Sequence, residues 1–294
     1  MTDKKRGPGR PPRKVVPNNP TNGIVDVPLN PNNIVEFHYY DPLVLRQLFV
    51  LFKQLKTEEI YFRFTADTFD ILTKDHYDNK ILASIDCSKV SHYYCKKLPE
   101  PLYLSTDRSN IQYVFLNINK DINNIQINYE TVDNMLQIKL SNAKMSKEDT
   151  RDVLMCSKAP DDSLLNLEKK VNMILPILSF SLPPKDFKDT ITDIINYSDR
   201  FTLEKHGDGP LIFTFPKAHV NKCETEYNDP DKISLTHTLK ENDSFSCIFH
   251  TNLLKSVSTS ISNSNITFKC MDGNDAIIAY NIENIITFNI NPKQ

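Results

Sequence analysis

The chain has 294 residues, of which 39% are hydrophobic and 24% are charged, so it is long enough for about two domains with apolar cores. Its formal net charge of −2 does not by itself indicate a nucleic-acid-binding protein. Only six residues are glycine, and GxGxxG, GxxxxGK[ST] and GxSxG are all absent. The sequence therefore excludes the familiar glycine-rich phosphate cradles and the nucleophile elbow of many hydrolases.

Residues 1–33 differ in composition from the rest of the chain. They contain seven of the eighteen prolines, and six basic residues stand against two acidic ones, which gives this segment a charge of +4 and leaves −6 for the remainder. The basic residues are Lys4, Lys5, Arg6, Arg10, Arg13 and Lys14. Because such a segment has too few apolar side chains to compensate the entropy of ordering, we predict a disordered basic arm.

The arm is also a candidate for contact with DNA. Gly9-Arg10-Pro11 lies inside the basic cluster and resembles an AT-hook, which places an extended arginine in the narrow minor groove of A·T tracts. The alternatives are a generic basic tail and a nuclear-import signal.

The cysteines and the apolar stretches indicate the compartment. No two of the six cysteines are closer than eight positions, so no CxxC pair occurs. The N-terminus carries no apolar signal sequence, and the apolar stretches are too short to span a bilayer. We expect an intracellular protein with reduced thiols.

The pattern from residue 34 onward predicts a first domain over residues 34–156. A strand at residues 34–40 leads into a helix that we expect Asp41 to cap, with Pro42 at its first position. A second helix is expected after Ser105-Thr106-Asp107, which could cap it. Further strands are predicted at residues 59–64, 69–72, 80–85, 125–129, 135–140 and 150–155.

Residues 157–172 are predicted to be an interdomain connector, after which the pattern repeats over residues 173–294. A strand at residues 174–182 precedes a helix opened by Pro183-Pro184, and a short second helix carries Leu253, Leu254 and Val257. The remaining strands are predicted at residues 201–204, 211–215, 233–239, 244–249, 266–269, 276–280 and 285–290. The fold class is therefore α+β, with two similar domains whose helices lie on one face of antiparallel sheets.

Several short motifs resemble those of the DNA sliding clamps, the family of proliferating cell nuclear antigen (PCNA). Residues 59–64 and 69–75 look like the early hairpin of that family, and His92-Tyr93-Tyr94-Cys95 resembles its F-x-x-Y-x-C motif. Asn289-Ile290-Asn291-Pro292-Lys293 resembles its C-terminal Y-L-A-P-K motif. The basic arm, followed by Val15-Val16-Pro17, looks closest to the PCNA-like proteins of asfarviruses and related large DNA viruses.

The resemblance implies a sliding clamp that encircles double-stranded DNA as a head-to-tail homotrimer and acts as a polymerase processivity factor in viral DNA replication and repair. Strand 150–155 of one subunit would pair with strand 233–239 of the next. It implies no catalysis, no cofactor and no membrane. A DNA polymerase and other replication or repair proteins would be partners, and a clamp loader is required unless the ring opens spontaneously.

Three alternatives remain open at this point. They are a viral transcription factor or scaffold built on the clamp fold, a nuclease or repair enzyme, and a monomeric DNA-binding module that uses only its arm. The resemblance implies a viral replication site in the host cell, either a cytoplasmic factory or the nucleus.

The resemblance also implies which residues carry the function. Basic residues on the helices would line the hole and attract phosphates without reading sequence. These are Arg46, Lys53, Lys56, Arg108, Lys185, Lys188 and Lys255. A groove for partner peptides would be lined by Leu164, Leu165, Leu167 and Pro292, with Lys74 and Ile81 nearby.

The sequence also contains short His/Cys spacings that look like halves of metal sites. They are His92-x-x-Cys95, His219-x3-Cys223 and Cys247-x-x-His250. Because a structural zinc site needs four ligands in paired spacings, we expect buried cysteines and surface histidines, and no bound metal.

Overall fold

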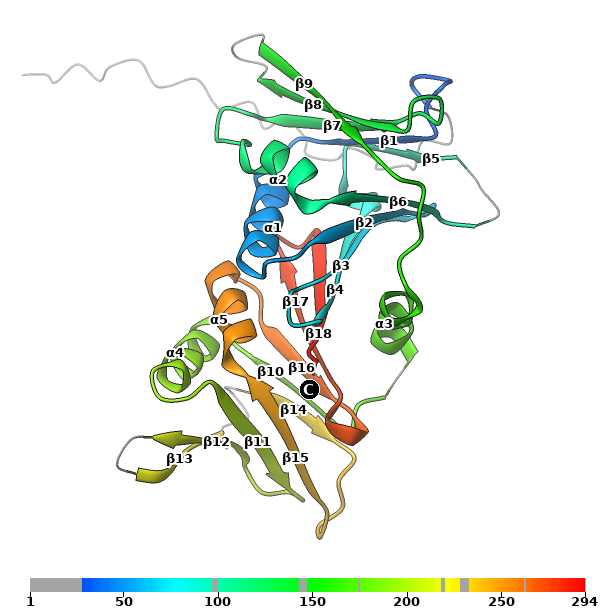
Figure 1. Cartoon of the computed structure of the whole chain (residues 1–294). Coiled ribbons are helices and arrows are strands. Elements are labelled where there is room, and N and C mark those ends of the chain that lie inside the picture. Colours follow the sequence, from blue (N-terminus) through cyan, green and yellow to red (C-terminus); the bar gives the residue numbers. More distant parts are fainter. Residues whose placement is uncertain are drawn as a thin grey trace, which may run out of the picture.

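The structure is a computed structural model that describes residues 28–96, 100–142, 147–173, 175–217, 220–227, 233–261 and 263–293 (Figure 1). The predicted arm lies outside the described residues, apart from its last few positions. No described helix is both long enough and apolar enough to cross a membrane.

The described residues of the first half form two α-helices, one short 3-10 helix (Cys87–Lys89) and nine strands. The helices are α1 (Leu43–Gln54) and α2 (Arg108–Leu116). The strands are β1 (Val35–Tyr39), β2 (Glu59–Phe64), β3 (Thr68–Lys74), β4 (Lys80–Asp86), β5 (His92–Cys95), β6 (Leu102–Asp107), β7 (Asn124–Tyr129), β8 (Met135–Asn142) and β9 (Lys147–Leu154).

The second half repeats this order of elements after a connecting helix, α3 (Asp162–Met173). Its helices are α4 (Pro184–Ile195) and α5 (Thr251–Ser260). Its strands are β10 (Leu178–Leu182), β11 (Arg200–His206), β12 (Leu211–Lys217), β13 (Val220–Tyr227), β14 (Ser234–His237), β15 (Ser244–His250), β16 (Ile266–Cys270), β17 (Ala276–Ile282) and β18 (Ile286–Asn291).

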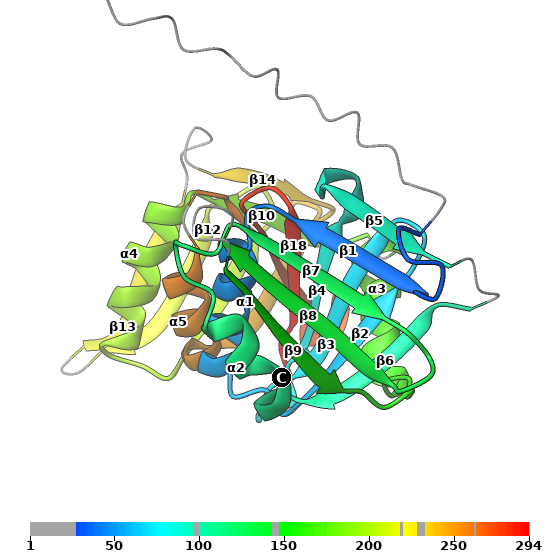
Figure 2. The same cartoon turned by 90° about the horizontal axis from the view of Figure 1, so that it is seen from above.

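The described strands form three antiparallel sheets. The first half supplies the sheet β5-β1-β7-β8-β9, and the second half supplies the sheet β13-β12-β11-β15. The third sheet, β14-β10-β16-β17-β18-β4-β3-β2-β6, takes strands from both halves and is continuous because β18 pairs with β4. Helices α1, α2, α4 and α5 lie together on one side of the molecule, whereas α3 lies on the opposite side (Figures 1 and 2).

The core lies between these helices and the sheets. The apolar stripe of α1, which includes Leu45, Leu48 and Phe52, is buried, as is the stripe of α4. Phe49 of α1 stacks on Phe115 of α2 with ring centroids 4.0 Å apart. Buried side chains of both halves form one hydrophobic cluster, so the two halves share a single core.

The predicted sequence of elements is confirmed for most of the chain, and the differences concern helix starts and short strands. The side chains of Asp41 and Asp107 make no capping hydrogen bond; Pro42 itself occupies the N-cap of α1, and α2 follows β6 directly. Strands β5, β6 and β13 were not predicted, because these edge strands carry little hydrophobic alternation.

The connector differs most from the expectation, because α3 fills most of residues 157–172 and extends to Met173. Asp161 stabilises its start: its carboxylate accepts hydrogen bonds from the backbone N–H of Leu164 at 3.0 Å and from Ser163 Oγ at 2.6 Å. Because α3 runs to Met173, β10 begins at Leu178 rather than at residue 174.

Helix α3 is held by a small core of its own. Leu164 and Leu167 are buried against Tyr61 of β2, Leu72 of β3 and Leu82 of β4. This cluster lies on the face of the nine-stranded sheet opposite the main core, since side chains alternate between faces along a strand.

Truncation of this small core should destabilise the protein. We expect Leu167→Ala to lower the free energy of unfolding by about 3 kcal/mol, because the side chain is fully buried and its removal leaves a cavity. Leu175→Ala is the matched control, since Leu175 is 91% exposed and should change stability by less than about 0.5 kcal/mol. Urea unfolding followed by circular dichroism measures both, and equal losses would show that α3 does not pack as described.

Candidate functional site

The structure brings the predicted DNA-facing residues to one side of the molecule. All seven lie on α1, α2, α4 or α5, or directly after α1, and these four helices share a side (Figure 2). Five of them are exposed: Arg46, Lys53, Lys56, Lys185 and Lys255. Arg108 and Lys188 are half-buried.

Contacts between the helices fix this face. Arg46 Nε of α1 donates to the carbonyl oxygen of Leu116 at the end of α2, at 3.4 Å. Thr259 Oγ1 of α5 donates to Gln54 Oε1 of α1 at 3.0 Å, which joins helices from the two halves. The basic side chains are therefore presented by a connected layer of helices rather than by separate elements.

Acidic residues are concentrated on one helix of this face. Helices α1, α2 and α5 contain no aspartate or glutamate, whereas α4 contains Asp186, Asp189 and Asp193 beside its two lysines. The positive charge of the helix layer is therefore carried mainly by α1 and its C-terminal Lys56. The arm residues Lys4, Lys5, Arg6, Arg10, Arg13 and Lys14 lie outside the described residues.

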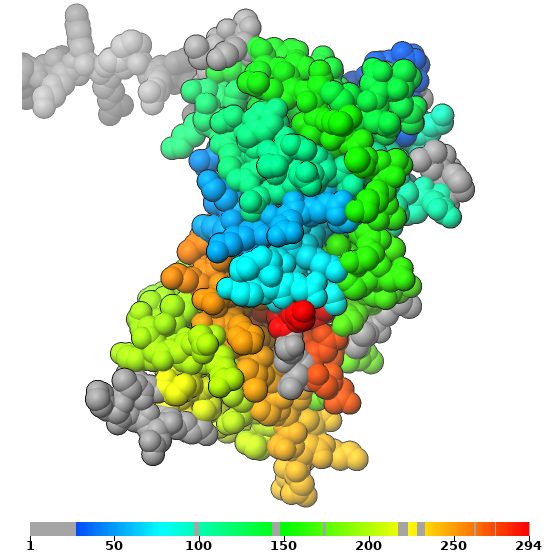
Figure 3. Space-filling view, in the orientation of Figure 1, coloured from blue at the N-terminus to red at the C-terminus, as the bar shows by residue number. Residues whose placement is uncertain are grey.

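The predicted partner groove is filled by the protein itself. Leu164 and Leu167 are 2% and 0% exposed in the small core under α3, and Ile81 is fully buried in the main core. These three side chains therefore cannot line an open groove in this structure, which corrects the expectation. Only Leu165 and Pro292 of the predicted apolar lining are half-buried, and in the space-filling view the green surface of α3 lies beside the cyan surface of the first half (Figure 3).

Ion pairs fasten α3 to both halves of the chain. Lys74, which was predicted to lie beside the groove, pairs instead with Asp161 at 2.6 Å. Lys170 of α3 pairs with Asp275 of the second half at 2.6 Å. Helix α3 thus bridges the two halves on the side opposite the other four helices (Figure 1).

A buried arginine also connects α3 to the sheet. Arg63 of β2 is 7% exposed; its guanidinium bonds Asp70 of β3 at 2.7 Å and also contacts Glu168 of α3. Burial by itself lowers the pKa of Arg63, but the hydrogen bond to Glu168 and the charge of Asp70 raise it above its usual value. The hydrogen bond from Arg63 lowers the pKa of Glu168. Neither residue could be identified from the sequence, since no spacing rule connects a strand to a helix a hundred residues away.

The strand edges determine where further sheet pairing can occur. Strand β9, at the end of the five-stranded sheet, pairs only with β8 among the described residues, and β14 pairs only with β10. Strand β13, at the end of the four-stranded sheet, pairs only with β12. The chain therefore has free edges in both halves.

Similarity to known proteins comes from relatives and from a solved structure. No protein-family model matches the chain. Protein E301R of African swine fever virus, including isolates from Kenya and Namibia, is 29% identical over 299 residues, covering 98% of each chain, and is described as uncharacterized.

The structure resembles that of PCNA from Thermococcus kodakaraensis, with a TM-score of 0.68 and 10% sequence identity over 87% of this chain and 98% of that one. The chain therefore has the sliding-clamp fold, which confirms the resemblance seen in the sequence and the α+β fold class.

Removal of the buried Arg63 guanidinium should destabilise the folded protein. We expect Arg63→Met to lower the free energy of unfolding by about 3–5 kcal/mol, because the Asp70 carboxylate, 1% exposed, is left without its cation. The double variant Arg63→Met/Asp70→Leu should recover most of this loss. Denaturant unfolding of the two variants tests the interpretation, and a single variant as stable as the parent chain would contradict it.

Proposed function

We propose that this protein is a sliding clamp, a ring of three chains that encircles duplex DNA and keeps a replicative or repair polymerase on its template. The observation that carries the proposal is the joint between the two halves of the chain, β4–β18. In this joint the last strand of the second half pairs antiparallel with the edge of the first-half strands β4-β3-β2-β6.

The same joint can be repeated between chains. The counterpart of β18 is β9, the last strand of the first half, and the counterpart of β4 is β13, the edge of the sheet β13-β12-β11-β15. Both are free edges among the strands that the structure describes. Pairing of β9 with β13 of the next chain makes a head-to-tail interface that removes both edges, and such interfaces generate rings when the rotation closes.

The internal repeat indicates a different partner strand for β9 at the interface between chains than the sequence suggested. The sequence suggested residues 233–239, which contain β14. The counterpart of β14 in the first half is β5, and β5 takes no part in the β4–β18 joint. The repeat therefore favours β13, which sequence analysis did not recognise as a strand.

The helix layer supports the contact with DNA. Exposed basic residues on α1 and α5, together with serine, threonine and asparagine side chains on α2 and α5, can bond phosphates without reading bases. A closed ring needs only weak contacts of this kind, because dissociation from DNA requires the ring to open. The proposal includes no catalytic step.

Partner docking in this proposal uses surfaces other than an open apolar groove under the connector. Helix α3 fills that position with its own leucines. The polymerase and other replication or repair proteins would bind either the outward face of α3 or a groove that opens only when α3 moves.

A ring of three chains predicts the molar mass of the protein in solution. Light scattering should give about three times 33.9 kDa per particle.

Proline substitutions in β9 test the interface. Adjacent residues of an edge strand point their N–H groups in opposite directions. Of Thr150→Pro and Arg151→Pro, one therefore removes an N–H group that bonds β8, and the other removes an N–H group that points away from β8. The variant that loses the free N–H should be a monomer with nearly unchanged thermal unfolding. A persistent monomer of the parent chain with and without DNA would contradict the proposal.

Contact with DNA should depend on the helix layer. Lys53→Glu should weaken binding to duplex DNA and make the dependence of log K on log salt shallower by about one for each phosphate that the protein no longer neutralises. Lys169→Glu is the matched control, because Lys169 is an exposed lysine of α3 on the opposite side. Fluorescence anisotropy at several salt concentrations measures both, and equal effects of the two substitutions would contradict the placement of DNA.

A clamp should also stay bound longer on circular DNA than on linear DNA. Protein assembled on closed circular DNA should remain bound at high salt and dissociate after a single cut, because a ring slides off a free end. Gel filtration before and after linearisation measures this retention. Equal loss from circular and linear DNA would favour the arm-only binding mode.

A further inference from the structure

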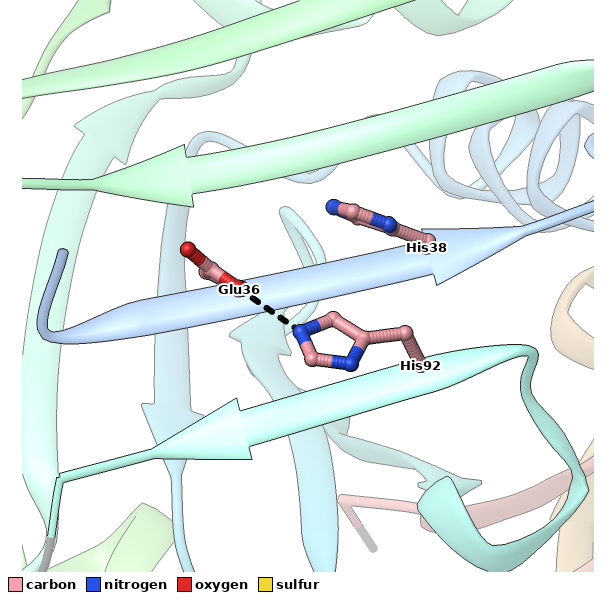
Figure 4. A group of neighbouring side chains, drawn as sticks. All are labelled: Glu36, His38 and His92. Carbon is pink, nitrogen blue, oxygen red and sulfur yellow. Dashed lines mark hydrogen bonds and ion pairs between the residues drawn. The ribbon is translucent and has the colours of Figure 1, made fainter. Parts of the chain in front are cut away.

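Three side chains with metal-binding groups gather on the five-stranded sheet, on the face away from the main core. They are Glu36 and His38 of β1 and His92 of β5 (Figure 4). One ligand atom of each lies within 4.8 Å of the others. This is the one group of three or more such residues found among the described residues.

Strand geometry explains why these residues meet. Glu36 and His38 are two positions apart on β1 and therefore point to the same face. His92 stands directly opposite His38 in the β1–β5 register. Three ligands, two from one strand and one from its neighbour, are thus held on adjacent strands rather than on loops.

Glu36 is a buried carboxylate with a fixed orientation. It is 1% exposed, and it accepts hydrogen bonds from the backbone N–H groups of Leu29 and Asn30 at 2.8 and 2.7 Å and from Asn33 Nδ2 at 2.7 Å. Burial by itself raises the pKa of Glu36, but these bonds lower it below its usual value. These hydrogen bonds hold the carboxylate in one orientation, as a metal-binding carboxylate must be held.

The two histidines supply the other two ligand groups. His92 Nε2 lies 2.7 Å from Glu36 Oε2, so a single proton joins the two atoms. The His38 ring lies with its centroid 4.8 Å from that of His92. Burial, together with the neighbouring His92, lowers the pKa of His38 below its usual value.

A fourth polar atom lies beside the cluster. Asn128 of β7 stands directly opposite Glu36; its side chain interacts with His38, and its buried Oδ1 atom makes no hydrogen bond of good geometry in the described part of the chain. Glu36, His38 and Asn128 all line a hollow of about 500 Å³ that opens to solvent. The cluster thus has an access route and an unsatisfied acceptor, which an ordered water can satisfy.

We propose that Glu36, His38 and His92 bind a zinc ion, with a water molecule as the fourth ligand that donates to Asn128 Oδ1. Two imidazoles and one carboxylate suit zinc, which takes such ligands at about 2.0–2.2 Å in a tetrahedron. The ion takes the place of the proton between Glu36 Oε2 and His92 Nε2, and His92 then carries its proton on Nδ1. Rotation of His38 toward this pair completes the set.

The ion would join three parts of the chain. It ties the edge strand β5 to β1, and through Glu36 it stabilises the turn at Leu29 and Asn30. That turn stands where the basic arm enters the folded chain, so the ion would fix the starting point of the arm on the sheet.

The test is metal binding by the full chain after treatment with a chelator. Calorimetric titration with zinc chloride should give one site per chain, and zinc should raise the midpoint of thermal unfolding. In the cobalt-substituted protein, the visible spectrum should show tetrahedral bands without a thiolate charge-transfer band, which separates this site from the free cysteines.

The decisive variant is His38→Gln. The hydrogen bonds that fix Glu36 do not involve His38, whose own contacts are with the His92 ring and the Asn128 side chain, so this substitution should lower the stability of the metal-free protein only slightly while weakening zinc binding by more than about 100-fold. His92→Gln should do the same to zinc binding with some loss of stability. His250→Gln, a substitution of an exposed histidine elsewhere, is the matched control and should bind zinc normally.

Either of two results would overturn the proposal. One is the absence of a one-to-one site in the parent chain; Glu36 then serves only to hold the turn at Leu29 and Asn30. The other is zinc binding that survives His38→Gln and His92→Gln but is abolished by alkylation of the cysteines.

Discussion

The pairing of β4 with β18 is the contact on which the rest of the structure depends. Along it, Ile81, Ala83 and Ile85 stand opposite Ile290, Phe288 and Ile286, and all six are buried in the main core. The two halves are therefore fused by backbone hydrogen bonds and by a continuous apolar layer. This joint aligns the helices of both halves on one side and leaves free edges at β9 and β13.

The same strand explains the unusual connector. Leu82 lies between Ile81 and Ala83 and therefore points to the opposite face of the sheet, where it packs under α3. Asn289, its neighbour on β18, is also buried on this side. The nine-stranded sheet thus has apolar contacts on both faces at the joint, and α3 supplies the cover on the second face. With α3 in this position, its own leucines occupy the space beneath it.

Charge in this molecule is separated by element rather than spread evenly. The helix layer is basic on α1 and mixed on α4, the arm is strongly basic, and the remainder is acidic. A protein that bound DNA by charge alone would need a denser positive surface. A ring needs less positive charge, because it stays on the DNA by enclosing it and not by tight binding. The modest charge of the helix layer is therefore consistent with the proposed clamp.

The sequence by itself determined the repeat, the positions of four of the five helices and most of the strands, because alternating and helical hydrophobic patterns are local properties. It also carried the resemblance to the sliding clamps through motifs such as Asn289-Ile290-Asn291-Pro292-Lys293. It placed Arg46 and Lys53 correctly on the polar side of the α1 stripe, whereas Lys56 lies beyond the end of that helix.

Only the tertiary structure decided how distant segments meet. The edge strand β13, the burial of Leu164 and Leu167, the Arg63–Glu168 pair and the cluster of Glu36 with two histidines all depend on contacts between elements far apart in the chain or on different strands. A leucine in a polar segment has the same local pattern whether it lines an open groove or fills one. What decides between the two is the shape of the surface opposite it, and that surface is formed by strands about a hundred residues earlier in the chain.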